Sequence, residues 1–184
     1  MILGGALAVA VAMYPVVYYG SKEKDNVIGM DAEGRVMRIP ELREAVVSDA
    51  AVARFCGESV QEIGTYNFED FNIRFRNLRG RFTEPGWRGY NKTMMDNKVP
   101  LSVKEHNLIQ VTVPQEPCAV IDGKPKGGRY WWKLRVKARR QATSGSRSAA
   151  PQELMIEMEI VRVGIAEAKE MIAIEKYSEL GGVP

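Results

Sequence analysis

The longest apolar stretch of the chain runs from residue 2 to residue 19 and contains no charged residue. As a helix it would measure about 27 Å, close to the roughly 30 Å hydrocarbon core of a bilayer. Three tyrosines, Tyr14, Tyr18 and Tyr19, lie toward its C-terminal end, where aromatic side chains favour the membrane–water interface. We therefore expect a transmembrane helix over 2–19. The alternatives are a secretory signal peptide and a buried soluble helix, but the stretch has no basic leader, no convincing cleavage site and no polar face.

The segment after this span, residues 20–45, reads as a polar linker with a short extended part. The linker turns at Asp31–Gly34 and its extended part stops at Pro40. Charge does not settle the orientation of the span, because only Lys22 and Lys24 flank it. Taken literally, the positive-inside rule would place the C-terminal side in the cytoplasm.

Helical spacing dominates the first half of the remaining chain, which we take as one domain over 46–180. Ser48 and Asp49 are typical helix caps. Apolar residues then recur at intervals of three and four, which predicts two helical faces. The first face consists of Val52, Phe55, Cys56, Val60 and Ile63, and the second of Phe68, Phe71, Phe75 and Leu78. Thr83 and Pro85 predict the start of a further helix, in which Trp87, Tyr90 and Met94 share a face.

From Val99 onward the period of the pattern changes to two, which is typical of strands. Candidate strands cover 108–114, 117–122, 130–138, 154–163 and 171–177, with turns predicted at 122–128 and 143–150. Helices followed by strands predict an α+β domain, in which helices pack on one face of a curved, mainly antiparallel sheet.

The stretch from Gly128 to Gln141 combines three aromatic residues with six Lys or Arg residues. Basic residues between aromatics are typical of a groove for single-stranded nucleic acid. The same stretch also alternates as a strand, with Trp132, Leu134, Val136 and Ala138 on one face. The next strand alternates too, so a hairpin would bring basic and acidic residues together: Lys133, Arg135 and Lys137 with Glu153, Glu157 and Glu159.

The register of this hairpin stays open, because pairing Lys133 with Glu157 or with Glu159 keeps the pattern. The hairpin leaves little unpaired positive charge on the strand, which disfavours a nucleic-acid partner. Basic residues outside the pairing are the better candidates for contacting an acidic partner. We place Arg139, Arg140 and Arg147 in the following loop as unpaired residues and add Lys124 and Lys126 from the preceding turn.

The composition argues against an enzyme with a familiar catalytic apparatus. The net charge is only +3, and the chain has one histidine and two cysteines. There is no phosphate-binding glycine loop and no metalloprotease or hydrolase motif. We expect no cofactor and no metal. A ligand-binding or enzymatic cup between helices and sheet is the alternative, with Tyr66, Asp70 and Tyr90 as its plausible polar residues.

The order of these features resembles the DotI/IcmL/TraM family of type IVB secretion and conjugation systems. The resemblance rests on a span, then "DAEGRVMRIPEL", "TYNFEDFNIRF", "FTEPGW", "GRYWWKLRV" and "MIEMEIVRV" in that order. It implies a non-enzymatic bacterial inner-membrane protein with a single span, a cytoplasmic N-terminus and a periplasmic nuclear transport factor 2-like domain. It also implies assembly with copies of itself or with other channel subunits.

Family members usually carry a cytoplasmic leader before the span, whereas only Met1 precedes it here, so it stays open whether Met1 is the natural start. A periplasmic location also gives Cys56 and Cys118 a meaning, because disulfides form in that compartment. The two cysteines are a candidate disulfide between the first helix and the start of a strand. Two buried free thiols are the alternative.

Overall fold

The computed structural model describes residues 28–30, 36–38 and 41–181, and the chain divides into two units, Met1–Glu41 and Leu42–Pro184. The predicted span over 2–19 and the turn at 31–34 lie outside the described residues. In the first unit, β1 (Ile28–Met30) pairs with β2 (Val36–Arg38) in antiparallel fashion. None of the helices in the described part is long and apolar enough to cross a membrane.

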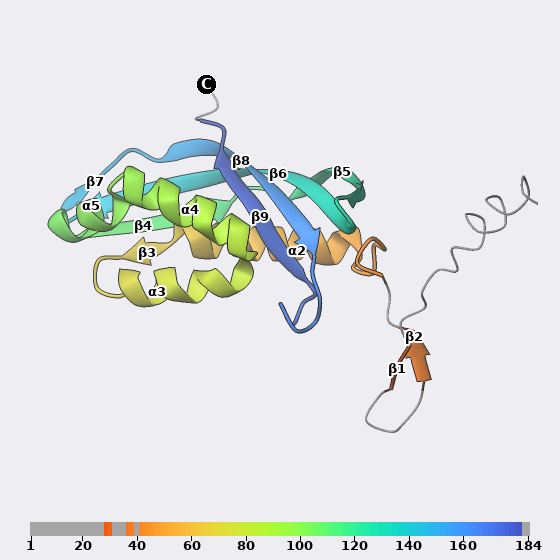
Figure 1. The fold of residues 1–184 in the computed structure, drawn as a ribbon. Coiled ribbons are helices and arrows are strands. Elements are labelled where there is room, and N and C mark those ends of the chain that lie inside the picture. Colours follow the sequence, from red (N-terminus) through yellow and green to blue (C-terminus); the bar gives the residue numbers. More distant parts are fainter. Residues whose placement is uncertain (1–27, 31–35, 39–40, 182–184) are drawn as a thin grey trace, which may run out of the picture. The chain divides into compact units, whose positions relative to one another are not determined.

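The second unit is an α+β domain in which helices lie on one side of a curled sheet (Figure 1). Its helical segments are α2 (Asp49–Gly64), α3 (Phe71–Leu78), η1 (Arg79–Arg81), α4 (Glu84–Asp96) and α5 (Val99–Glu105). Its strands are β3 (Tyr66–Asn67), β4 (Leu108–Pro114), β5 (Ala119–Lys126), β6 (Arg129–Ser144), β7 (Arg147–Ser148), β8 (Gln152–Arg162) and β9 (Ile172–Glu179). The predicted fold class is therefore confirmed.

The strand β6 is the centre of the sheet. The strand order is β3-β4-β6-β8-β9, and β5 and β7 also pair with β6. The pairings between these strands are all antiparallel. β6 is longer than the sequence predicted, because tight turns at Gly127–Gly128 and Gly145 replace the broad loops expected at 122–128 and 143–150. These three glycines have positive φ angles of 61°, 81° and 57°.

Two local predictions about the helices are confirmed and two segments differ, the first being Phe68, which lies in a turn before α3 and not on its helical face. The side-chain oxygens of Ser48 and Thr83 accept hydrogen bonds from the backbone N–H groups of Ala51 and Gly86, as expected of helix caps. Residues 99–105, where the period of two was expected to begin, form α5 instead. Seven residues are too few for the pattern to distinguish a helix from a strand.

The core lies between α2 and the inner face of the sheet. The predicted face of α2 is fully or almost fully buried, from Val52 to Ile63. It packs on alternate residues of β6 and β8 in one cluster: Trp132, Leu134, Val136, Ala138, Leu154, Ile156, Met158 and Ile160. Burying each large aliphatic side chain contributes about 1.5–3 kcal/mol, so this contact holds the helix on the sheet.

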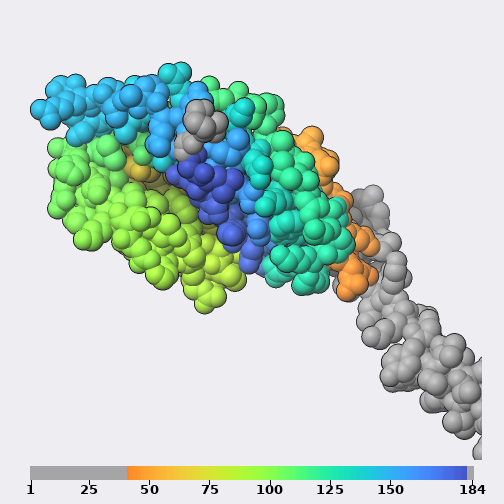
Figure 2. Space-filling view, turned by 90° about the horizontal axis from the view of Figure 1, so that it is seen from above, coloured from red at the N-terminus to blue at the C-terminus, as the bar shows by residue number. Residues whose placement is uncertain are grey.

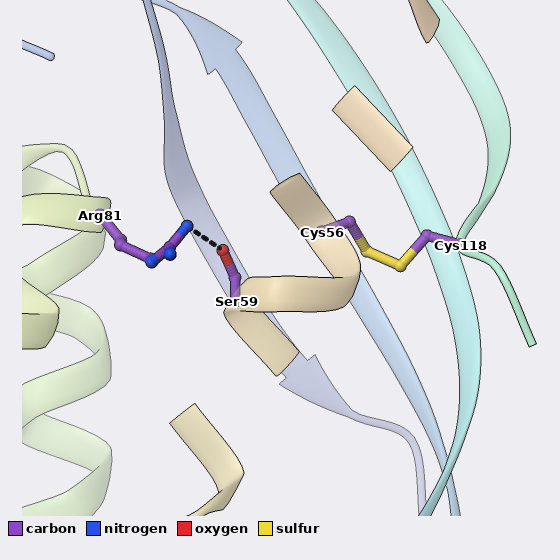
Figure 3. Close-up of a disulfide and its surroundings, with 4 residues drawn as sticks. All are labelled: Cys56, Ser59, Arg81 and Cys118. Carbon is purple, nitrogen blue, oxygen red and sulfur yellow. Dashed lines mark hydrogen bonds between the residues drawn. A yellow bond between two sulfur atoms is a disulfide. The ribbon is translucent and has the colours of Figure 1, made fainter. Parts of the chain in front are cut away.

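A disulfide and the contacts of Arg81 hold α2 on two sides, and Figure 3 shows the disulfide and the hydrogen bond between Arg81 and Ser59. Cys56 on α2 is joined to Cys118, just before β5, across a sequence separation of 62 residues. On another side of α2, Arg81 Nη1 donates to Ser59 Oγ at 3.5 Å. Arg81 Nε and Nη2 also donate to the two carboxylate oxygens of Glu62, at 2.5 and 2.6 Å. The helix is therefore tied both to the sheet and to η1.

We predict that removing the disulfide with the double variant Cys56→Ala/Cys118→Ala lowers the free energy of unfolding by about 4 kcal/mol, since the bridge closes a long loop in the unfolded chain. Urea unfolding with and without a thiol reductant measures this. Reductant should destabilise the wild-type protein and leave the double variant unchanged. Two reactive thiols in denatured, unreduced protein would contradict the bridge.

Candidate functional site

The hairpin of β6 and β8 brings the basic and acidic rows of the sequence together. In its register Lys133 lies opposite Glu159, Arg135 opposite Glu157, and Arg139 opposite Glu153, whereas Lys137 lies opposite Met155. The ion pairs do not follow the register in every case, because Lys133 reaches diagonally to Glu157. Both pairings that the sequence left open for Lys133 are therefore used, one by the backbone and one by the side chain.

Glu157 is the centre of this charge network. Its carboxylate lies 2.7 Å from Lys133 Nζ and 2.9 Å from Arg135 Nη2. The hydrogen bond from Lys133, and to a smaller extent the one from Arg135, holds the pKa of Glu157 below its usual value. Much of the positive charge that suggested a nucleic-acid groove is neutralised within the domain.

The three aromatic residues at the start of β6 do not form an exposed stacking surface. Trp132 is fully buried and its Nε1 donates to Asp49 Oδ1 at 3.2 Å. Trp131 is 8% exposed and donates to Glu159 Oε2. Bases stack on exposed aromatic faces in single-strand binding proteins, so this geometry disfavours the nucleic-acid interpretation.

The five basic residues proposed as partner contacts do not form one patch. Lys124 and Lys126 lie on β5, next to the start of β6, and their ammonium groups cover the Trp131 ring. Arg147 lies on β7, which pairs with the other end of β6. Arg139 and Arg140 belong to β6 itself, not to a loop as the sequence suggested, because the strand continues to Ser144.

The prediction that Arg140 is unpaired is wrong. The alternation that buries Trp132 to Ala138 continues to Arg140, which puts this side chain on the inner face of the sheet. There its guanidinium forms a two-fold hydrogen-bonded ion pair with the carboxylate of Glu179 on β9. A charged residue at the end of an apolar row was the signal in the sequence that could have identified this position.

A cavity of about 590 Å³ opens beside Arg140, between α4 and the strands β4, β6 and β9. Tyr66 and Tyr90, two of the residues named for the alternative cup, line this cavity together with Tyr177 and Glu179. Asp70, the third named residue, does not. It precedes α3, and its carboxylate accepts a hydrogen bond from Arg74 Nε at 2.6 Å.

The tyrosines of the cavity are hydrogen-bond donors and not bases. Burial raises the pKa of Tyr66, Tyr90 and Tyr177 above the usual value, and the carboxylate of Glu179 acts in the same direction on each. These phenols stay protonated at physiological pH. The sequence did not indicate Tyr177 or Glu179, because they lie beyond an irregularity in the pairing of β8 and β9 that no local pattern shows.

The family model described as "Type-IV b secretion system, inner-membrane complex component", for DotI and IcmL, matches residues 1–179. The chain belongs to this family. A search of curated proteins found no match.

Three solved structures show the same fold at low identity. The periplasmic domain of DotI is 22% identical with a TM-score of 0.69, and covers 73% of this chain and 96% of its own. A periplasmic fragment of TraM is 14% identical with a TM-score of 0.64, over 71% and 95%. An IcmL-like type IV secretion protein from Legionella pneumophila is 15% identical with a TM-score of 0.67, over 75% and 96%. The second unit thus has the nuclear transport factor 2-like fold of these periplasmic domains.

We predict that Glu157→Gln lowers the free energy of unfolding by about 1 kcal/mol at neutral pH, because it removes two cross-strand ion pairs. The pKa of Glu157 is lowered by folding, so its contribution is present above the unfolded pKa and is lost as the pH falls through the folded pKa. The stability difference between wild type and variant should therefore shrink below about pH 4.

Urea unfolding across this pH range measures the effect, and Glu153→Gln is the matched control. Glu153 is exposed on the same strand and has no ion pair within the described residues. Equal losses from both substitutions would contradict a specific role for Glu157.

Proposed function

We propose that this protein is a structural, non-enzymatic subunit of a type IV secretion or conjugation apparatus. Residues 2–19 anchor it in the bacterial inner membrane, and the domain over 46–180 lies in the periplasm. That domain assembles with a second copy of itself. The family description of an inner-membrane complex component supports the first part, and the side-chain pattern of β4 supports the assembly.

The strand β4 has its polar residues inside and its apolar residues outside. Gln110 and Thr112 are buried toward α2, whereas Ile109, Val111 and Val113 are 44%, 43% and 45% exposed on the other face. Ile121 of β5 is 52% exposed as well. β-Branched apolar side chains in a row on a sheet face indicate a surface that is covered in the working assembly. We call Ile109, Val111 and Val113 the β4 outer row.

The end of α2 explains why β4 is oriented this way. The last carbonyl of this helix, Gly64 O, accepts hydrogen bonds from Thr112 Oγ1 at 2.9 Å and from Gln110 Nε2 at 3.1 Å. Because unsatisfied buried carbonyls are costly, the polar residues are needed inside. A Cβ on Gly64 would lie 2.4 Å from the Thr112 side chain, so this contact between the end of α2 and β4 also requires glycine at position 64. The β4 outer row must consequently face away from the core.

The charges beside the β4 outer row favour a second copy as its occupant. Val113 lies opposite Arg139 on β6, and Arg139 lies opposite Glu153 on β8. The sheet face therefore carries an apolar row with both basic and acidic residues next to it. Such a face can meet its own copy around a two-fold axis without net repulsion, as in isologous dimers.

We predict that Val111→Cys forms an intermolecular disulfide in native membranes, because residue 111 of two copies would lie near the two-fold axis. Non-reducing electrophoresis of full-length protein measures the cross-linked dimer. Arg88→Cys, on the exposed side of α4, is the control and should remain monomeric. Adding Val113→Lys to Val111→Cys should reduce the cross-link about tenfold.

A dimer from Arg88→Cys with none from Val111→Cys would contradict the proposed interface. A Val111→Cys cross-linked species whose mass differs from that of a dimer would mean that a different subunit covers the β4 outer row. That result would overturn the proposal that a second copy covers it.

The periplasmic location has its own test. We predict that protease added to spheroplasts removes the C-terminal domain of the full-length chain, and that intact cells protect it. Immunoblotting with a C-terminal epitope measures this. Protection in spheroplasts, with digestion only after lysis, would place the domain in the cytoplasm and reject the proposal.

A further inference from the structure

The cavity beside Arg140 exists because α4 diverges from β9. At Gly86 the helix touches the strand so closely that an added Cβ would lie 2.4 Å from Ile174 O. One turn later, a Cβ on Gly89 would meet nothing within 4 Å. Both glycines line the same cavity, which is therefore a wedge that opens along the helix. In Figure 2 a hollow separates the green helical segment from the blue strands.

The size of this cavity suits a small molecule. Its volume of about 590 Å³ falls within the range of about 300–1,000 Å³ typical of ligand sites. The apolar parts of its wall come from Ile63, Met94 and Val99. The rings of Tyr90 and Tyr177 meet edge to face, with centroids 5.9 Å apart. The wall is thus apolar and aromatic, with polar groups at a few points.

Arg140 and two tyrosine hydroxyls supply polar groups to the wall of this cavity. The Nη1 and Nη2 groups of Arg140 bind Glu179, but its Nε is buried and has no partner among the described residues. A buried N–H without an acceptor costs free energy. Because Nε has almost no accessible surface, an acceptor in the cavity would instead meet the hydroxyls of Tyr66 and Tyr90, which line the same space.

The ion pair also selects the charge of a ligand. The charges that line the cavity cancel, since Arg140 and Lys176 are matched by Glu175 and Glu179. A charged ligand would therefore lose its hydration there without a net attraction in return. A carbonyl oxygen carries no net charge and accepts two hydrogen bonds. It therefore matches the donors without disturbing the pair.

We propose that this cavity is a binding site for a small uncharged molecule with a flat apolar body and a carbonyl oxygen. The site lies on the inner side of the sheet, away from the β4 outer row, and stands independently of the proposed assembly.

The uncharged naphthyl ketone Prodan is a suitable probe, and anilinonaphthalene sulfonate is its anionic counterpart. We expect saturable binding of Prodan to the full-length protein, read as energy transfer from its three tryptophans, none of which lies in the predicted span. Gly89→Leu should weaken this binding at least about tenfold, because the new side chain fills the wedge. Gly57→Leu, also in a helix with open space around its Cβ, is the matched control and should bind as wild type does.

The ion pair is tested by Glu179→Gln, which leaves the charge of Arg140 uncompensated. This substitution should raise the affinity for the sulfonate several-fold and change that for Prodan little. Thr93→Phe, at a second position of the α4 wall, is an independent blocking variant should Gly89→Leu lose its near-UV circular dichroism. Prodan binding that survives both blocking variants would overturn the site. Wild-type protein that prefers the sulfonate would overturn the charge selection.

Discussion

The unbroken alternation of side chains along β6 is the constraint on which the rest of the domain depends. Its pairings with β4 and β8 contain no register shift. Even-numbered residues from Trp132 to Arg140 therefore point inward, and odd-numbered residues from Arg135 to Arg139 point outward. A slip of one residue would exchange the two faces completely. The core, the charge network around Glu157 and the position of Arg140 all follow from this one register.

The two faces of the sheet provide surfaces of different chemistry. The inner face begins as an apolar core beneath α2 and ends at the Arg140–Glu179 pair, where α4 has diverged and leaves a cavity. The outer face carries the β4 outer row next to charges of both signs. Because the hydrogen bonds from Thr112 and Gln110 to Gly64 O fix the orientation of β4, the domain cannot bury that row by itself. A protein that assembles through its sheet and binds a small molecule beneath it would use both faces without competition between them.

Much of this fold could be predicted from the sequence, because periodicity reports which residues face the core. The α2 face, the caps at Ser48 and Thr83 and the β6–β8 hairpin all follow from local patterns of this kind. The cavity could not be predicted in the same way. It depends on the angle between α4 and β9, and on Glu179, which reaches Arg140 across β8. The exposure of the β4 outer row could not be predicted either, because alternation identifies two faces of a strand but not which one is buried. At β4 the hydrogen-bonding needs of Gly64 decide that question.

The proposed assembly requires that the outer face of β4 is covered in the membrane while the inner side of the sheet remains open to a ligand. Cysteine accessibility along β4 and at the cavity mouth tests this most directly. Single cysteines at 109, 111, 113 and 89 would be labelled in native membranes and again after the assembly is dispersed in detergent. We expect cysteines at 109, 111 and 113 to be protected in membranes and to become reactive on dispersal, while a cysteine at 89 reacts in both states. Equal labelling of the β4 positions in both states would contradict it.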